Sequence, residues 1–182
     1  MADPFLLTAF RFEVRLLRSP DLKAGQQQLP GQGDGYTPPT SAKLLAAGAF
    51  QDCSGLEIEM DVQEYVEGGR NNGVVRRVGR AKYQPLVLKR GMFHAGGEST
   101  VDTSLWHWLQ RIINGERPVP RYDGVIHVMS ADGTVRASWM FDRGLPSKIK
   151  GPELNAKSGE IAIEELTIAH EGLRLLPAEV PA

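Results

Sequence analysis

The chain has 182 residues, of which 41% are hydrophobic and 24% are charged, and its formal net charge is -1. This composition is typical of one folded domain with a real core, and the charge argues against nucleic acid as the main partner, because phosphate binding normally requires a basic surplus. A single cysteine excludes an internal disulfide framework, and no segment approaches the about 20 apolar residues that a membrane helix needs.

The N-terminal part of the chain predicts one strand and a long insertion. Its first ten residues contain an acidic residue and no basic segment, so we expect no secretory signal. Apolar and charged residues then alternate from Phe10 to Leu16, which predicts a strand. Residues 19–40 are rich in Gly, Pro and Gln, and are either a tolerated surface insertion or an arm that orders against a neighbouring molecule. Residues 41–48 predict a short helical turn.

The segment from Gly55 to Gly91 predicts a long β-hairpin. Its first strand should bury an apolar face and leave the carboxylates in water; the apolar residues are Leu56, Ile58, Met60 and Val62, and the carboxylates are Glu57, Glu59 and Asp61. A Gly-rich basic loop from Gly68 to Arg80 leads to a second strand from Tyr83 to Arg90. These strands are longer than one small domain needs, so we expect the extra length to pack against another subunit.

One helix is expected between residues 103 and 114. Asp102 is placed as its N-cap, and Gly115 stands where a glycine closes a helix. Apolar residues form a stripe so broad that more than one side must be covered; they are Leu105, Trp106, Trp108, Leu109, Ile112 and Ile113.

Three further strands complete the expected elements. Residues 124–130 and 134–142 should form a hairpin across the Asp132–Gly133 turn, and Gly and Pro at 144–152 should interrupt the next connection. In the last strand, residues 160–170, the apolar positions change parity, which predicts a bulge near Glu164 and Glu165. The elements together predict a mainly β fold with one helix.

The residue types that usually carry out catalysis do not form a recognisable catalytic motif in this sequence. Four histidines lack the spacing of metal ligands, and Cys53 has no histidine nearby in the sequence, so we expect an inert thiol. Carboxylates that alternate along one strand are more often a solvated face than an acid–base pair. We therefore expect no enzyme, no metal site and no cofactor.

The basic loop and the helix are better suited to contacts between subunits. The loop lacks the GK[ST] of a phosphate loop and leads into a strand, so its arginines should pair with carboxylates of a neighbouring copy. Aromatic side chains on a helix usually pack in a core or an interface. The residues expected at inter-subunit or inter-ring contacts are Arg70, Asn71, Asn72, Arg76, Arg77, Arg80, Trp106 and Trp108.

The order of several short motifs resembles the phage-type tail tube family of contractile tails and contractile injection systems. Each motif is weak alone, but their order and spacing over most of the chain are specific. The pieces are Ser54–Glu57, Glu64–Gly69, Lys82–Gly91, Trp106–Trp108, Trp139–Phe141, Pro146–Lys148, Gly151–Pro152 and Ile161–Leu173.

The resemblance implies a single tail-tube domain over residues 1–182, with two packed antiparallel sheets that close toward a barrel and one flanking helix. Six copies would form a ring, and rings would stack around a channel for cargo or DNA, with Glu57, Glu59 and Asp61 on the lumen or another wet face. Partners would be other copies, a contractile sheath protein, and baseplate and tube-capping proteins. The subunit would not bind nucleic acid or membrane stably. It would assemble in the bacterial cytoplasm, as part of a phage tail or a released extracellular particle.

Two alternatives stay open at this point. The insertion at 19–40 is longer than the connection common in plain tube subunits, so the chain could be a baseplate-proximal ring that initiates the tube. The other alternative is a small β-rich binding or adaptor module, which would require a concave site with exposed aromatic side chains.

Overall fold

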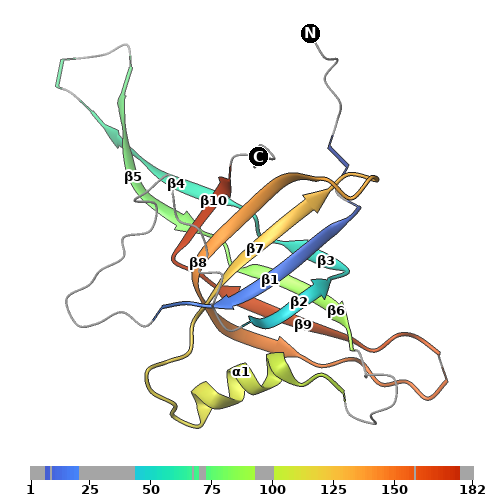
Figure 1. Ribbon diagram of the computed structural model, residues 1–182. Helices are drawn as coiled ribbons and strands as arrows, with labels where there is room; N and C mark the ends of the chain where they lie inside the picture. Colours follow the sequence, from blue (N-terminus) through green and yellow to red (C-terminus); the bar gives the residue numbers. More distant parts are fainter. Residues whose placement is uncertain are drawn as a thin grey trace.

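The structure, a computed structural model, describes residues 7–8, 10–20, 44–66, 68–69, 73–92, 101–157 and 159–176. Within these ranges the chain forms ten strands and one helix (Figure 1). The strands are β1 (Phe12–Arg18), β2 (Leu44–Ala49), β3 (Asp52–Ser54), β4 (Ile58–Tyr65), β5 (Val75–Tyr83), β6 (Leu86–Gly91), β7 (Tyr122–Met129), β8 (Val135–Lys150), β9 (Ile163–Ala169) and β10 (Gly172–Leu176), and the helix is α1 (Ser104–Ile113). The insertion expected at 19–40 lies outside the described residues from residue 21 onward.

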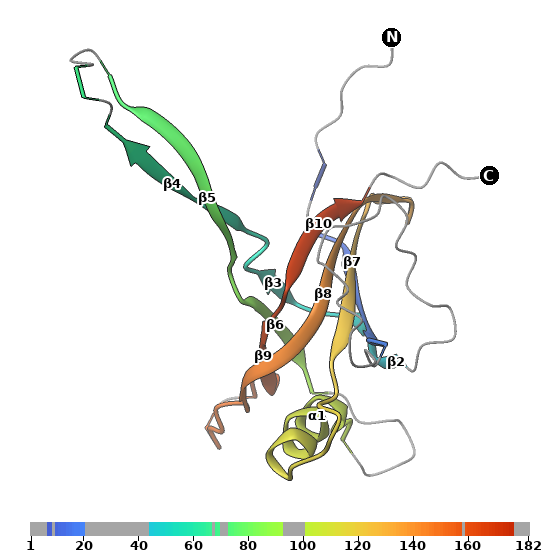
Figure 2. The same ribbon diagram turned by 90° about the vertical axis from the view of Figure 1, so that its left-hand side faces the viewer.

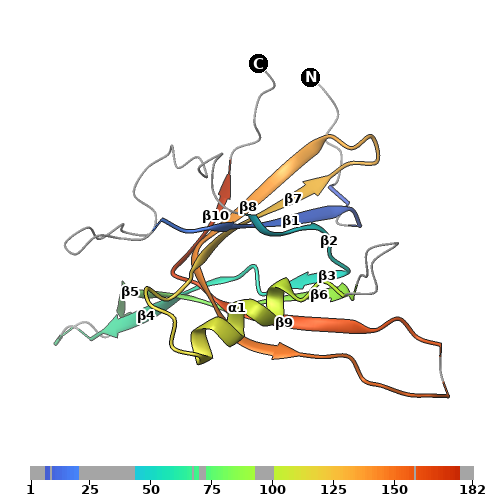
Figure 3. The ribbon, with the colours of Figure 1, turned by 60° about the horizontal axis from the view of Figure 1, so that its bottom comes forward.

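Two antiparallel sheets share the long strand β8 and lie face to face (Figure 3). Sheet A has the order β2-β1-β7-β8-β10, and sheet B has the order β8-β9-β6-β3. The first half of β8 pairs with β7 and β10, and its second half pairs with β9. The predicted arrangement of two packed sheets with one helix is therefore confirmed.

The core lies between the two sheets, where every second residue of each strand points inward. Val14 of β1 is paired with Ile126 of β7, and Leu88 of β6 is paired with Leu166 of β9. All four side chains are almost completely buried. Burying a side chain of this size contributes about 1.5–3 kcal/mol, so these paired positions fix which face of each strand points inward.

Helix α1 covers one end of the two sheets, opposite the end at which β10 finishes (Figures 1 and 2). Its start is held by Asp102, whose Oδ1 accepts a hydrogen bond from the backbone N–H of Ser104 at 2.9 Å. Gly115 follows its end with φ +84°, in the left-handed conformation that favours glycine. The predicted helix and its closing glycine are confirmed, but the N-cap is Thr103 rather than Asp102, which lies one residue earlier. Ile113 at the edge of the apolar stripe remains exposed.

Several predicted elements were wrong in type or extent. Residues 44–49 form strand β2 rather than a helical turn, because they pair with β1. Strand β8 continues through Gly144 and Pro146, which were expected to interrupt it. The basic loop is shorter than predicted, since β5 already begins at Val75. The short strands β3 and β10 were not predicted.

The bulge predicted near Glu164 and Glu165 was also wrong. The pairing of β9 with β6 runs without a shift from Ile163 to Ile168, and the irregularity lies in β8 between Pro146 and Lys148. The change in parity has another cause: Glu164 points into the core together with Leu166 and Ile168 and is only 1% exposed. A buried carboxylate thus occupies a position that the pattern would assign to an apolar residue.

Candidate assembly surface

The β4–β5 hairpin projects away from the body of the subunit (Figure 2). It forms a two-stranded sheet of its own, beyond β3 and β6, from which its strands continue. Within the part of the chain that the structure describes, no other strand pairs with the hairpin, and both of its outer edges are therefore unpaired.

One face of the hairpin is apolar and exposed. Cross-strand pairs place Ile58 opposite Tyr83, Met60 opposite Ala81 and Val62 opposite Val78, and residues directly opposite each other share a face. Val62 is 61% exposed and Val78 is 75% exposed. The prediction that the alternating apolar residues of this strand are buried was therefore wrong within one subunit. A contiguous apolar strip of this kind marks an interaction surface.

The opposite face of the hairpin is polar and carries both signs of charge. Glu59 lies opposite Lys82 in the register, and Lys82 Nζ donates to Asp61 Oδ1 at 2.7 Å. This hydrogen bond, followed by the charge of Asp61, raises the pKa of Lys82. Glu57 and Glu59 are exposed, so the predicted row of carboxylates does lie in water, but Lys82 offsets part of its charge.

Six arginines and asparagines in the segment after Gly69 were expected at contacts between subunits, and the structure describes three of them. Arg70, Asn71 and Asn72 lie outside the described residues. Arg76, Arg77 and Arg80 lie in strand β5 rather than in the loop. Arg76 Nε lies 3.2 Å from Glu64 Oε1, and the guanidinium of Arg77 lies 5.0 Å from the centre of the Tyr65 ring.

The pair between Arg76 and Glu64 is solvent-exposed on both sides. Exposed ion pairs of this kind contribute about 0–1 kcal/mol. The pair can therefore open and let Arg76 bind a carboxylate of another molecule without loss of the fold.

The base of the hairpin is tightly built. Gly55 has φ +89°, and a Cβ at this position would lie 2.2 Å from the carbonyl oxygen of Pro85. The ring of His170 packs against Tyr83 and Phe141, with ring centres 5.5 and 5.7 Å apart. Burial lowers the pKa of His170. The packed, neutral ring of His170 and the glycine at position 55, where a side chain would clash, thus set the direction in which the hairpin leaves the body.

The two tryptophans of α1 both contact their own subunit. Trp108 is completely buried, packs edge-on against Tyr122 at 4.8 Å between ring centres, and donates from Nε1 to the carbonyl oxygen of Pro120 at 2.8 Å. This position does not fit the contact role expected for Trp108 between subunits. Trp106 is half-buried and donates from Nε1 to Glu164 Oε2 at 2.9 Å.

A buried ionic network connects α1 with sheet B. Arg90 of β6 donates from Nε to Glu164 of β9 and also pairs with Asp102 just before the helix, at 3.0 Å. Glu164 uses its second oxygen for Trp106, so every oxygen of this carboxylate has a partner. Burying a charge is costly unless it is paired in this way. The sequence pattern did not predict the pair of Arg90 and Glu164; its only signal was the change of parity among the apolar residues of β9.

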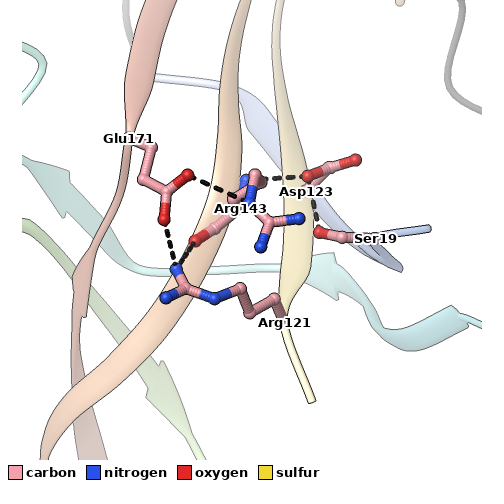
Figure 4. A network of polar contacts seen from close by, with 5 residues as sticks. All are labelled: Ser19, Arg121, Asp123, Arg143 and Glu171. Carbon is pink, nitrogen blue, oxygen red and sulfur yellow. Dashed lines mark hydrogen bonds and ion pairs between the residues drawn. The ribbon is translucent and has the colours of Figure 1, made fainter. Parts of the chain in front are cut away.

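A second network fixes the corner where β8 passes from sheet A to sheet B (Figure 4). Arg143 has φ +53°, a rare conformation for a residue with a side chain. Its backbone N–H donates to Asp123 Oδ1 at 2.8 Å, and Ser19 Oγ donates to the same oxygen at 2.6 Å. Glu171 accepts from Arg121 at 2.7 Å and from Arg143 at 2.9 Å. These contacts stabilise the corner between the two sheets.

The described residues contain no group of metal-ligating side chains. Burial, followed by the charge of Asp52, raises the pKa of the Cys53 thiol to about 11, which fits the inert thiol that was predicted. No helix in the described part of the chain has the length and apolar character needed to cross a membrane.

Comparison with known proteins identifies a family. Residues 8–174 match the family model described as T4-like virus tail tube protein gp19. This match confirms the resemblance drawn from the motifs. No curated protein sequence matches the chain.

Solved structures share the fold of this chain. A chain in the cryo-EM structure of the anti-feeding prophage (AFP) baseplate is 22% identical with a TM-score of 0.68, and the match covers 99% of this chain and 100% of that chain. A chain of the extracellular contractile injection system PVC, in its extended sheath–tube complex, is 20% identical with a TM-score of 0.66 and coverage of 94% and 91%. A chain of the AFP tube terminating cap is 21% identical with a TM-score of 0.64 and coverage of 96% and 93%.

Proposed function

This chain belongs to the T4-like virus tail tube protein family, and we propose that it is the subunit of the inner tube of a contractile tail or injection system. The family is structural, and the chain is not an enzyme. In this proposal, residues 1–182 form one tail-tube domain, six copies form a ring, and rings stack around a central channel.

The observation that carries this proposal is the exposed apolar face of the β4–β5 hairpin. The hairpin that carries this face projects from the body (Figure 2). An exposed apolar strip is unfavourable in water unless another molecule covers it. Val62 and Val78 lie on it and are largely exposed in the single subunit. In a tube built from one kind of subunit, the molecule available to cover this face is a neighbouring copy of the same chain.

The geometry of the hairpin favours a closed ring. The apolar face lies on the projecting hairpin, so the surface that covers it must lie on a different part of the neighbouring copy. Such head-to-tail contacts close into rings when the rotation between copies allows it. Pairing between open strand edges would add backbone hydrogen bonds between neighbours.

The polar residues of the hairpin have two proposed places. Glu57, Glu59 and Asp61 face the channel, where water and cargo or DNA in transit meet them. The arginines beside the tip contact the neighbouring copy or the next ring, together with the exposed parts of α1 around Trp106; they are Arg70, Arg76, Arg77 and Arg80, with Asn71 and Asn72 between them.

The proposed partners are a contractile sheath protein, baseplate proteins and tube-capping proteins. Chains with this fold occur in structures described as a sheath–tube complex, a baseplate and a tube terminating cap. The proposed location is a tail or injection particle that assembles in the bacterial cytoplasm and acts outside the cell in which it was made.

A second candidate is the baseplate-proximal ring that starts the tube. It is favoured by the similarity, over 99% of this chain, to a chain in a baseplate structure. The two candidates differ in whether the purified chain polymerises without a template.

The experiment that tests the proposal is negative-stain electron microscopy of the purified full chain over a series of salt concentrations, together with its mass in solution. Six-fold rings or stacked tubes are expected. Single rings that never stack would favour the initiator. A monomer under all conditions, including in the presence of preformed tubes of the same particle, would contradict both candidates.

A further inference from the structure

A hollow lies on the open face of sheet B, beside the connection from β8 to β9. Its volume is about 340 Å³. Its floor is formed by side chains of β6 and β9 that point away from the core, and its wall by the end of β8 and the residues that follow. The lining includes Lys89, Lys150, Glu153, Glu160, Ile161 and Glu165. The connection projects beyond the end of sheet B (Figure 3), so another molecule can reach the hollow.

Apolar side chains are exposed in this hollow and on the same connection. Ile161 is 78% exposed, although it lies so close to Gly91 that an added Cβ there would be 3.4 Å from Ile161 Cγ2. Ile163, which pairs with Gly91, also lines the hollow. Leu154 in the connection is 89% exposed. Exposed apolar side chains at one site mark an interaction surface.

The lining of the hollow also has one negative charge that is not neutralised within the described part of the subunit. Its two lysines and two of its three carboxylates have partners of opposite charge. These pairs are Lys89–Asp52 at 2.9 Å, Lys150–Glu153 at 3.0 Å and Lys148–Glu165 at 3.9 Å. The third carboxylate, Glu160, is exposed and forms no ion pair with another described residue. Glu160 can therefore accept a cation from another molecule.

The apolar face of the β4–β5 hairpin has the matching pattern. Its register places Val62 opposite Val78 and, two residues nearer the tip, Glu64 opposite Arg76. Residues two apart along a strand share a face, so Arg76 lies on the same face as Val78. This face presents an apolar pair followed by a positive charge, whereas the hollow presents apolar side chains and a free carboxylate. The two surfaces are complementary in both respects.

The hairpin and the hollow lie at opposite ends of sheet B. Strand β6 begins at Leu86, close to the end of β5, and finishes at Gly91, which pairs with Ile163 in the hollow. A strand of this length spans about 17–20 Å. Figure 3 shows the hairpin and the β8–β9 connection on opposite sides of the subunit. Contact between these two surfaces therefore joins different copies, head to tail.

The wall and floor of the hollow are already fixed in the single subunit. An added Cβ at Gly151 would lie 3.4 Å from the ring of Trp106, and that ring donates to Glu164 at 2.9 Å. The backbone N–H of Met92 donates to the carbonyl oxygen of Ala162 at 2.8 Å, which continues the pairing of β6 with β9. A surface that is ordered before contact loses less conformational entropy on binding.

We propose that this hollow receives the β4–β5 hairpin of a neighbouring copy, with Val62 and Val78 against Ile161 and with Arg76 paired to Glu160. This inference rests on the proposed function and specifies which surface covers the apolar face of the hairpin. Each copy carries one hairpin and one hollow, so every copy in a tube can give and receive the same contact.

The first test reverses the two charges of the proposed pair in the full chain. Arg76→Glu and Glu160→Arg should each lower the fraction of protein that sediments as tubes by about tenfold or more, because like charges then face each other across the contact. The double variant Arg76→Glu/Glu160→Arg should restore tubes, since the pair is remade with exchanged signs. Lys157→Glu, at an exposed position of the same connection outside the lining, is the control and should sediment as wild type.

The second test cross-links assembled tubes. The double variant Val78→Cys/Ile161→Cys is treated with a short bismaleimide and separated on a denaturing gel, where a ladder of linked subunits is expected. Val78→Cys/Arg136→Cys, with the second cysteine at an exposed position of β8 in sheet A, should give no ladder. The native Cys53 can remain, because burial raises the pKa of its thiol to about 11 and the thiolate is the reactive form.

Each outcome decides the inference. A ladder from the Ile161 pair supports it, whether the ladder ends at one ring or continues along the tube. Tubes that form normally but give no ladder, or a double reversal that stays as defective as the single ones while its melting temperature is that of wild type, would overturn it and leave the proposed function intact. A wild-type chain that forms no rings or tubes would overturn the proposed function itself, which microscopy of the same samples reports separately.

Discussion

Arg90 and Glu164 form an ion pair inside the subunit, with 2.5 Å between Nε and Oε1, although Arg90 is 7% exposed and Glu164 is 1% exposed. The pair joins β6 to β9, and its further partners Asp102 and Trp106 bring the start of α1 against sheet B. This network fixes the helix to the sheet through an ion pair, Arg90–Glu164, that is almost completely shielded from water.

The first prediction concerns this pair. Glu164→Ala should lower the free energy of unfolding by about 3–5 kcal/mol, because it leaves Arg90 buried without its closest partner. Urea unfolding followed by circular dichroism measures the change. Glu153→Ala is the control, since Glu153 is 88% exposed and should change stability by less than about 0.5 kcal/mol. Equal midpoints for the two variants would refute the structural role of the pair.

The second prediction concerns the base of the hairpin. Gly55→Ala should destabilise the subunit by about 1–3 kcal/mol and redirect the hairpin, because residue 55 has a positive φ and its Cβ would strike the Pro85 carbonyl. Thermal unfolding and the yield of rings report the two effects. Gly73→Ala, where an added Cβ meets nothing within 4 Å, should behave as wild type. A Gly55→Ala protein with normal stability and normal rings would show that this glycine is dispensable.

The third prediction separates assembly from folding. Val62→Glu should abolish rings while the melting temperature of the monomer stays unchanged, because Val62 is already exposed in the subunit. Sedimentation velocity measures assembly, and calorimetry measures folding. Glu59→Gln on the opposite face of the same strand is the control and should still assemble. Normal rings from Val62→Glu would mean that the apolar face is not the contact.

The fourth prediction concerns the arginines of β5. Arg76→Glu/Arg77→Glu should shorten or abolish tubes and leave the subunit folded, since both side chains are exposed and their partners in the subunit contribute little. Tube lengths in electron micrographs provide the measurement. Arg136→Glu, which alters an exposed arginine on β8, is the control. Unaltered tube lengths in the double variant would contradict an inter-ring role.

The fifth prediction concerns pH. Burial holds the pKa of folded His170 below its ordinary value of 6.5, so below about pH 6.5 the unfolded chain binds more protons than the folded one and stability falls as the pH decreases. His170→Gln should show a smaller loss of stability between pH 7.5 and pH 5 than wild type, measured by urea unfolding at each pH. His107→Gln, at an exposed position of α1, should lose as much as wild type. The same loss in all three proteins would remove His170 as the cause.

The sequence predicted the elements whose pattern is local. The alternation in β1, the Asp132–Gly133 turn between β7 and β8, and the closing glycine at position 115 each depend on neighbouring residues, and the structure contains all three. The order of the motifs also identified the family, because many short motifs, each weak alone, follow one another in a specific order over most of the chain.

The remaining features depend on contacts between distant residues. Strand β2 has an alanine-rich sequence without alternation and exists because β1 offers it an edge. The inward position of Glu164 depends on Arg90, 74 residues earlier. The exposure of the β4 apolar face could not be predicted from the sequence. An alternating pattern indicates that one face of a strand avoids water, but it does not indicate whether the same subunit or another molecule covers that face.

Cryo-EM of the assembled particle, at a resolution that shows side chains, is the most direct test of the central claim that another copy covers the apolar face of the β4–β5 hairpin. The account predicts Ile58, Met60, Val62 and Val78 in contact with a neighbouring subunit. A map in which this face lies in solvent, with the subunits joined elsewhere, would contradict the account.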